Sequence, residues 1–253
     1  MRVQDMHIQD RSHLINHGKG VVVIHNASNV CKLKDWDDAK GGDIEAANKL
    51  LDKFWKTKSF NELQELLDLS EKIVFLSVPS SSGKNMITEV LGERLANYFS
   101  AKFYSGRNFY VPEKLGLSKF MDDYDRVFTP KKYKKIADTS LLKDSQIVVI
   151  EDLMLTGSSI FSFIRQLRSD ELYVRTFAAL LGNPQLEATP NDIAELAKRL
   201  SELNIQLDAD LIGRIFSHSE ISIIRSSLDW KKKSHVINDL NIQIKERSFK
   251  LEN

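Results

Sequence analysis

The stretch of sequence that decides the fold spans residues 147–160 and reads IVVIEDLMLTGSSI. An apolar run ends there in two adjacent acids, Glu151 and Asp152, and a turn of small, hydroxyl-bearing residues follows. A chain that needed only a turn would commonly use Gly, Asn or Pro at this point. We therefore expect this stretch to hold a ligand that carries both hydroxyl groups and phosphate.

The elements around this stretch form a strand–helix–strand unit. Apolar runs and periodicity predict a strand at 146–150, a helix at 158–167 and a strand at 172–181. An earlier unit has the same order, with a strand at 73–78, a helix at 85–99 and a short strand at 102–104. Two such units predict an α/β fold, with a central, mostly parallel sheet and helices on both of its faces.

The rest of the chain suggests three regions. Residues 1–70 are predicted to hold a strand and helices of the core or of a hood, 71–185 the core itself, and 186–253 a mainly helical cap or subdomain. In the first region we predict a strand at 21–24, a helix at 43–56, and a helix at 61–69 capped by Ser59 or Asn61. Near the C-terminus, HVINDLNIQI fits both a strand and a helix.

Composition limits the class of protein. Lys and Arg number 36 against 35 Asp and Glu, so neither a nucleic acid nor a membrane surface is an expected partner. No apolar run approaches the roughly 20 residues that span a bilayer. The single cysteine, Cys31, has no partner for an internal disulfide. The polar N-terminus does not resemble a secretory signal, and we expect a cytoplasmic protein.

The acidic turn has the chemistry of a sugar-phosphate site. Ligands bind at the carboxyl ends of the strands in an open parallel sheet, where both acids are expected. The helix that follows begins with free N–H groups and a positive dipole end, which favour phosphate. Thr156, Ser158 and Ser159 add hydroxyls, and Gly157 lets the backbone approach. A ribose 5-phosphate fits this arrangement better than a bare phosphate does.

Residues 148–157, VVIEDLMLTG, resemble the signature of the type I phosphoribosyltransferases. The resemblance implies that Glu151 and Asp152 hold the ribose hydroxyls of phosphoribosyl pyrophosphate and contact Mg²⁺ only indirectly, through ribose and water. It implies that the 5-phosphate is held by Leu155, Thr156, Gly157, Ser158 and Ser159. The alternative is a solvated turn whose acid pair is incidental and whose Ser158 caps the helix.

One position departs from the family pattern. Purine-specific members often carry an acid immediately before the Thr-Gly pair, where it acts as a base towards the nucleobase. Here Leu155 occupies that position and cannot transfer a proton. This substitution argues against purine salvage.

A second turn lies where the family has its pyrophosphate loop. After the strand at 73–78 come Ser80, Ser81, Ser82, Gly83 and Lys84, at the start of a predicted helix. We predict a catalytic role for Lys84. Together with the serine hydroxyls and the helix N–H groups, it would stabilise the leaving pyrophosphate. The alternative is a serine-rich cap with Lys84 in water. Val78 and Asn85 break the pattern of a nucleoside-triphosphatase loop, which argues against that alternative.

Residues 105–145 are the least regular part of the sequence. In the resembling family a flexible segment here closes over the active site, which makes Arg107 a candidate ligand of the donor's phosphates. Lysines 131, 132, 134 and 135 share this expectation, although a solvated basic face would give the same pattern. Base specificity would be set partly by the loop at 182–185.

Two function hypotheses follow from the resemblance. The first is a phosphoribosyltransferase that moves ribose 5-phosphate from phosphoribosyl pyrophosphate to a small nitrogenous acceptor and releases pyrophosphate, with Mg²⁺ as cofactor. The second is a non-catalytic regulatory or interaction module that binds phosphoribosyl pyrophosphate or a nucleotide on the same fold. A weaker third option is processing of a nucleotide or of the free donor. The sequence leaves open whether the protein forms a homodimer.

Overall fold

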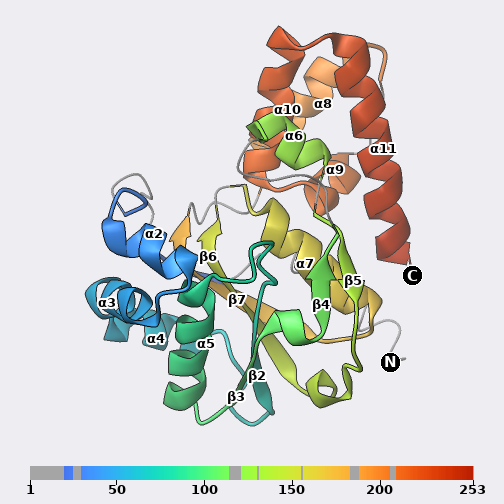
Figure 1. Ribbon diagram of the computed structural model, residues 1–253. Helices are drawn as coiled ribbons and strands as arrows, with labels where there is room; N and C mark the ends of the chain where they lie inside the picture. Colours follow the sequence, from blue (N-terminus) through green and yellow to red (C-terminus); the bar gives the residue numbers. More distant parts are fainter. Residues whose placement is uncertain are drawn as a thin grey trace.

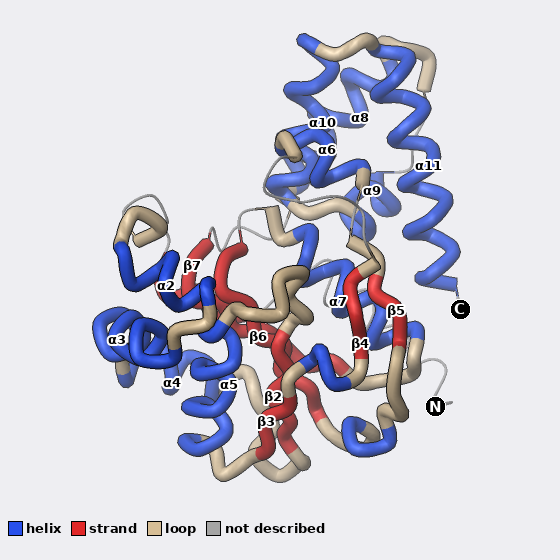
Figure 2. Tube along the Cα trace, viewed as in Figure 1, coloured by secondary structure: helices blue, strands red, loops and turns tan. Residues whose placement is uncertain are grey.

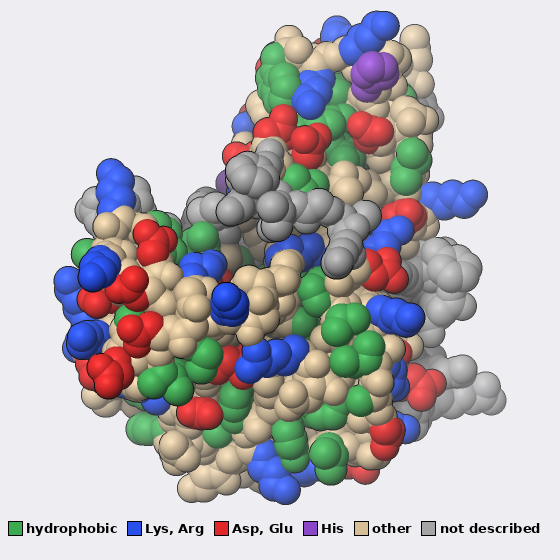
Figure 3. All heavy atoms as spheres, in the orientation of Figure 1, with side chains coloured by type: hydrophobic (Ala, Val, Ile, Leu, Met, Phe, Trp, Pro, Cys, Tyr) green, Lys and Arg blue, Asp and Glu red, His purple; other side chains and the backbone are tan. Residues whose placement is uncertain are grey.

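The computed structural model describes residues 20–24, 30–113, 121–129, 131–154, 156–182, 188–205 and 209–252. The chain forms a sheet with helices against it and a helical part that stands on one end of the sheet (Figure 1). Basic and acidic side chains are interspersed on the visible face of both parts (Figure 3). No described helix combines the length and the apolar character needed to cross a membrane.

The main sheet is parallel throughout. Among the described residues it has five strands in the order β1-β7-β6-β2-β3. They are β1 (Gly20–Ile24), β2 (Ile73–Ser77), β3 (Lys102–Tyr104), β6 (Gln146–Met154) and β7 (Val174–Gly182). Strand β6 lies at the centre, and its alternate side chains face opposite sides of the sheet. This arrangement confirms the predicted α/β class.

Helices α2 to α5 cover one face of the sheet (Figure 2). Leu51 of α3 and Leu91 of α5 are fully buried there, in one cluster with Val148 and Ile150 of β6. The helices are α2 (Lys34–Gly41), α3 (Ile44–Phe54), α4 (Thr57–Gln64) and α5 (Met86–Tyr98). Since α2 and α3 pack beside α5, they reach the edge at which the parallel strands end.

Helix α7 (Ser158–Ser169) and a two-stranded antiparallel hairpin cover the opposite face. The hairpin consists of β4 (Tyr110–Pro112) and β5 (Tyr133–Lys135), flanked by 3-10 turns at Gly106–Asn108 and Ser140–Leu142. Phe163 of α7 packs edge-on against Tyr110, with ring centroids 5.4 Å apart, and lies 5.0 Å from the Tyr133 ring. These aromatic contacts fix the hairpin beside the start of α7.

A third apolar core holds the helical part together. It consists of α6 (Asp123–Phe128), α8 (Pro190–Ser201), α9 (Ala209–Ile215), α10 (His218–Trp230) and α11 (Lys233–Glu252). Val127 of α6 is fully buried in this core together with Leu196 and Ile224. The segment at 105–145 therefore supplies α6 to the helical part and the strands β4 and β5 to the layer that covers the main sheet.

Two expectations about the N-terminal region are wrong. The helix predicted at 61–69 begins at Thr57 and ends at Gln64, and both predicted caps, Ser59 and Asn61, lie inside it. Helix α2 was not predicted at all, because charged residues dominate it and only Trp36 and Ala39 are buried. The second error matters because α2 carries a residue of the candidate site.

Candidate active site

The two acids lie at the carboxyl end of the central strand. The sequence predicted that β6 ends at Ile150 and that the acids belong to the following turn, but the strand continues to Met154. Glu151 pairs with Ala179 and Leu153 with Leu181 of β7, which keeps this extension in the sheet. The sheet therefore fixes the backbone of both acids, and only 8% of Glu151 and 4% of Asp152 is exposed.

Asp152 is an ionised carboxylate with a cationic partner. Its Oδ2 lies 2.5 Å from Nζ of Lys40 in α2, and its Oδ1 accepts the N–H of Leu153 at 2.7 Å. Burial alone would raise the pKa of Asp152, but Lys40 and these hydrogen bonds hold it below its ordinary value. Burial likewise disfavours the charged form of Lys40, and Asp152 more than offsets this effect and raises the Lys40 pKa.

The environment of Glu151 favours its neutral form. Burial and the neighbouring charge of Asp152 raise the pKa of Glu151 well above its ordinary value, and Lys131 only partly counteracts this. Its Oε1 accepts the N–H of Asp152 at 3.0 Å. Glu151 therefore holds a proton at pH values where an exposed glutamate is ionised, so the pair combines one neutral and one charged carboxyl group.

We expect Glu151→Gln to raise the melting temperature, with a gain that grows as pH rises from the unfolded pKa towards the raised folded pKa of Glu151. The stability contributed by protonated Glu151 is complete below the unfolded pKa near 4.5 and is lost as pH rises towards the raised folded pKa. Glutamine is neutral throughout and avoids this loss, which corresponds to a gain of about 2–4 °C for each kcal/mol. Thermal unfolding followed by circular dichroism measures it, with exposed Glu62→Gln as control. A pH-independent difference would contradict the protonated state.

The turn after the acids opens α7 at the same end of the sheet. Gly157 is the residue before the helix and has φ 74°, a left-handed conformation that suits glycine. The interpretation of Ser158 as helix cap is therefore wrong. The N–H of Ser158 donates to Thr156 Oγ1 at 3.3 Å, and the Ser158 hydroxyl donates to the Arg126 carbonyl at 3.0 Å. Leu155 lies outside the described residues.

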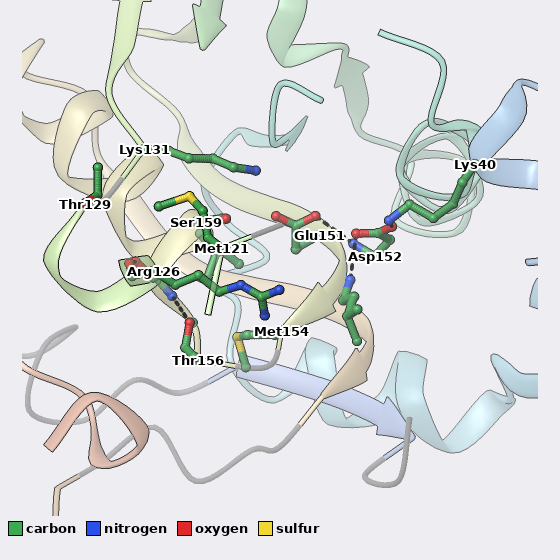
Figure 4. A pocket seen from close by; sticks show the side chains of 14 residues that line it. Lys40, Met121, Arg126, Thr129, Lys131, Glu151, Asp152, Met154, Thr156 and Ser159 are labelled. Carbon is green, nitrogen blue, oxygen red and sulfur yellow. Dashed lines mark hydrogen bonds and ion pairs between the residues drawn. The ribbon is translucent and has the colours of Figure 1, made fainter. Parts of the chain in front are cut away.

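Both the acids and the turn line one cavity of about 280 Å³. From the turn, its walls include Thr156, Gly157, Ser158 and Ser159. Three cationic side chains also line it, Lys40 from α2, Arg126 from α6 and Lys131 at the start of the hairpin's second strand. Figure 4 shows Lys131 and Arg126 extending across the cavity while Lys40 meets Asp152 from the other side. Cations therefore approach the acids from three separate elements.

The predicted pyrophosphate loop lies at the end of the neighbouring strand. The N–H of Val78 donates to the carbonyl of Ile150 at 2.9 Å, so the chain leaves β2 directly beside the acids. Ser80 and Ser82 share a hydrogen bond of 3.0 Å between their hydroxyls. Lys84 is exposed. These loop residues are not among those that line the cavity of the acids.

Arg107 joins this loop from the next segment of the chain. Its guanidinium donates to the carbonyl of Gly83. The adjacent Gly106 is essential to that approach, because a Cβ built on it would lie 2.0 Å from the carbonyl oxygen of Ser77. The N–H of Gly106 also donates to the Ser77 hydroxyl at 3.1 Å. The structure thus brings Arg107 and residues 80–84 together at the end of β2.

The chain's own side chains do not form a metal cage at this site. Among the described residues, no group of three or more His, Cys, Asp or Glu could hold a metal ion. One oxygen of Asp152 is taken by Lys40, and Glu151 holds a proton.

Lys40 and Arg126 are the residues that sequence reasoning missed. Lys40 lies 112 positions from Asp152, and no local pattern links them. The available signal was Gly41-Gly42 after Lys40, since a helix commonly ends at such a glycine with a lysine in its last turn. Arg126 follows three aspartates in a segment that appeared irregular, and α6 forms there because the helical part covers it.

No family model and no curated protein matches this chain. Similar solved structures include an adenine phosphoribosyltransferase from Saccharomyces cerevisiae, complexed with D-2,5-dideoxy-2,5-imino-altritol 1,6-bisphosphate and adenine. It is 14% identical, with TM-score 0.30 over 50% of this chain and 71% of that one.

Two further similar structures are an adenine phosphoribosyltransferase from Thermoanaerobacter pseudethanolicus and a hypoxanthine phosphoribosyltransferase from Staphylococcus aureus. The first is 12% identical, with TM-score 0.32 over 55% of this chain and 82% of that one. The second is 13% identical, with TM-score 0.29 over 60% and 65%. All three carry names of the family that residues 148–157 resemble.

Proposed function

We propose that this cavity binds phosphoribosyl pyrophosphate and transfers its ribose 5-phosphate to a nitrogenous acceptor. The proposal rests on one geometric observation: two buried acids, one of them ion-paired to Lys40, line one cavity with the first residues of a helix. A sugar diol both donates and accepts hydrogen bonds, and phosphate favours the N–H groups that open a helix. Ribose 5-phosphate carries both groups.

Each wall of the cavity has a distinct role in this proposal. The Asp152 carboxylate accepts a hydrogen bond from one ribose hydroxyl, and the protonated Glu151 side chain donates to or accepts from the other. The N–H groups of residues 158–160 hold the 5-phosphate. Lys131 and Arg126 balance the charge of the bound phosphates, since both extend across the cavity.

The leaving pyrophosphate would lie towards the end of β2. Lys84, Arg107 and the hydroxyls of residues 80–82 lie at that end of the sheet, beside the strand that carries the acids. We propose that they bind the diphosphate when the donor is present. Mg²⁺ bound with the donor would neutralise part of its diphosphate charge. Glu151 and Asp152 would contact the ion only through ribose hydroxyls and water.

The reaction itself requires positioning and charge stabilisation. The bond between C1 of the ribose and the diphosphate oxygen breaks, and its electron pair leaves with pyrophosphate. The lone pair of the acceptor nitrogen forms the new C1–N bond, and the nitrogen then loses a proton to water. Fixed cations and helix N–H groups stabilise the departing charge without reorganisation.

A pyrophosphate-release assay tests the proposal. The protein is incubated with Mg²⁺, phosphoribosyl pyrophosphate and a panel of nucleobases and amines, while calorimetry measures donor binding separately. We expect the donor to bind, and pyrophosphate to appear with at least one acceptor in wild type but not in Asp152→Asn. A folded protein that does not bind the donor would refute the proposal.

The second candidate function is a non-catalytic module that binds the donor or a nucleotide. The observation that favours it is Leu155, which offers no proton-transfer group where purine-specific relatives often have an acid. In the same assay this function gives donor binding without pyrophosphate release for every acceptor. The two candidates therefore differ in turnover and share the ligand.

A further inference from the structure

A second cavity lies between the sheet part and the helical part. It measures about 420 Å³ and is bounded by the hairpin strand β5, by α7 and by α11. Its walls carry five cationic side chains, Lys131, Lys132, Arg165, Lys245 and Arg247. The one carboxylate among the lining residues belongs to Glu246.

The cations of this second cavity are incompletely neutralised. Glu246 lies 3.6 Å from Lys132, and Glu220 lies 3.1 Å from Arg247, so these two cations have partners. Within the described part of the chain, no carboxylate lies in ion-pair distance of Arg165, Lys131 or Lys245. The residues that line the second cavity therefore carry more positive than negative charge, which favours an anionic occupant.

Arg165 is the central residue of the second cavity. It is mostly buried on α7, and one nitrogen donates to the Ser162 hydroxyl at 3.1 Å. Burial and the neighbouring Arg247 guanidinium lower the pKa of Arg165 to about 9. The charge of Glu220 acts in the opposite direction but does not restore the ordinary pKa of Arg165, so an anion in the second cavity would stabilise both guanidinium groups.

We propose that the second cavity binds a phosphorylated small molecule of the size of a nucleotide. Arg165 and Lys245 would bind the phosphate, since guanidinium and ammonium groups are the usual phosphate ligands of proteins. The volume exceeds the needs of inorganic phosphate. Tyr133 and the aliphatic parts of the basic side chains provide walls for an organic group, and Gln166 and Gln243 supply amide donors and acceptors.

The second cavity is physically linked to the first. Lys131 lines both cavities, and the Tyr133 hydroxyl donates to the carbonyl of Ser159, at the start of α7, at 3.3 Å. Gln243 donates to the carbonyl of Phe128 at 3.2 Å, which ties α11 to the segment that carries Arg126. An occupant that moves these residues would change the affinity of the first cavity. This coupling rests on the proposed function, whereas the binding itself does not.

The test is nucleotide binding in an Asp152→Asn background, which disables the first cavity. Calorimetry with AMP, GMP, UMP and inorganic phosphate is run on Asp152→Asn alone and combined with Arg165→Gln or Lys245→Gln. We expect one nucleotide to bind to Asp152→Asn, with at least about 10-fold weaker binding after Arg165→Gln and about 3–10-fold weaker binding after Lys245→Gln. Lys58→Gln, at an exposed site elsewhere, should leave the affinity unchanged.

Three results would overturn the inference. One is the absence of nucleotide binding by folded Asp152→Asn protein. Another is a nucleotide affinity that neither Arg165→Gln nor Lys245→Gln changes in the Asp152→Asn background. Lys245 is exposed, so we expect its variant to keep the fold. The third is inorganic phosphate binding as tightly as the nucleotides, which would contradict a site for an organic phosphate. None of these measurements depends on turnover, so they separate this site from the proposed function.

Discussion

Asp152→Asn is expected to weaken binding of phosphoribosyl pyrophosphate about 100-fold, whereas Glu151→Gln is expected to weaken it no more than about 5-fold. Asp152 is ionised and held by Lys40 at 2.5 Å, so asparagine removes the charge that, in the proposed function, accepts a hydrogen bond from a ribose hydroxyl. Burial and the charge of Asp152 raise the pKa of Glu151 well above its ordinary value, so glutamine matches the neutral form that this environment favours. Calorimetry with donor and Mg²⁺ measures both affinities.

Asp37→Asn is the matched control for this comparison. Asp37 lies on α2, the helix that carries Lys40, but its side chain is exposed. The Asp37→Asn protein should bind the donor with wild-type affinity. The melting temperature of Asp152→Asn should fall by only a few degrees, because Lys40 is 40% exposed and water can solvate it when its partner is lost. Equal donor affinity in wild type and Asp152→Asn would assign the acids a structural role.

The centre of the fold could be predicted because its signals are local. The apolar run of β6, the acid pair and the glycine turn before α7 are contiguous, and each matches a backbone requirement of the sheet edge or the helix start. The boundary after Ile150 could not be predicted in the same way. Whether β6 ends there or continues depends on pairing with β7, which lies on a later part of the chain.

The helical part shows a different limit of sequence reasoning. The buried face of α11 contains Val236 and Leu240, and then Gln243 and Arg247 at the same helical spacing. Because polar residues replace apolar ones halfway along, the periodicity that would identify a helix disappears from the sequence. Gln243 and Arg247 are buried only because other elements provide their partners. These partners include Phe128 and Val127, more than 100 positions earlier.

Arg247→Met is expected to destabilise the protein by about 3–5 kcal/mol. Arg247 is 3% exposed and forms a two-pronged ion pair with Glu220, which is 1% exposed, at 3.1 and 3.2 Å. It also donates to the carbonyls of Ile215 at 2.8 Å and Val127 at 3.0 Å. Removal of the guanidinium leaves a buried carboxylate and two buried carbonyls without this donor. Thermal unfolding should show a melting temperature lower by roughly 6–20 °C.

Two further variants make this expectation specific to the buried pair. Lys245→Met changes an exposed residue of the same helix and should shift the melting temperature by less than about 2 °C. Arg247→Met combined with Glu220→Leu removes both charges and should recover most of the lost stability, since the cost lies in the unpaired carboxylate.

Because Arg247 also holds the carbonyl of Val127, next to Arg126, the single variant should weaken donor binding as well. If Arg247→Met unfolds within about 1 kcal/mol of wild type, the ion pair does not hold α6, α10 and α11 together, and the helical part must position Arg126 through its apolar core alone.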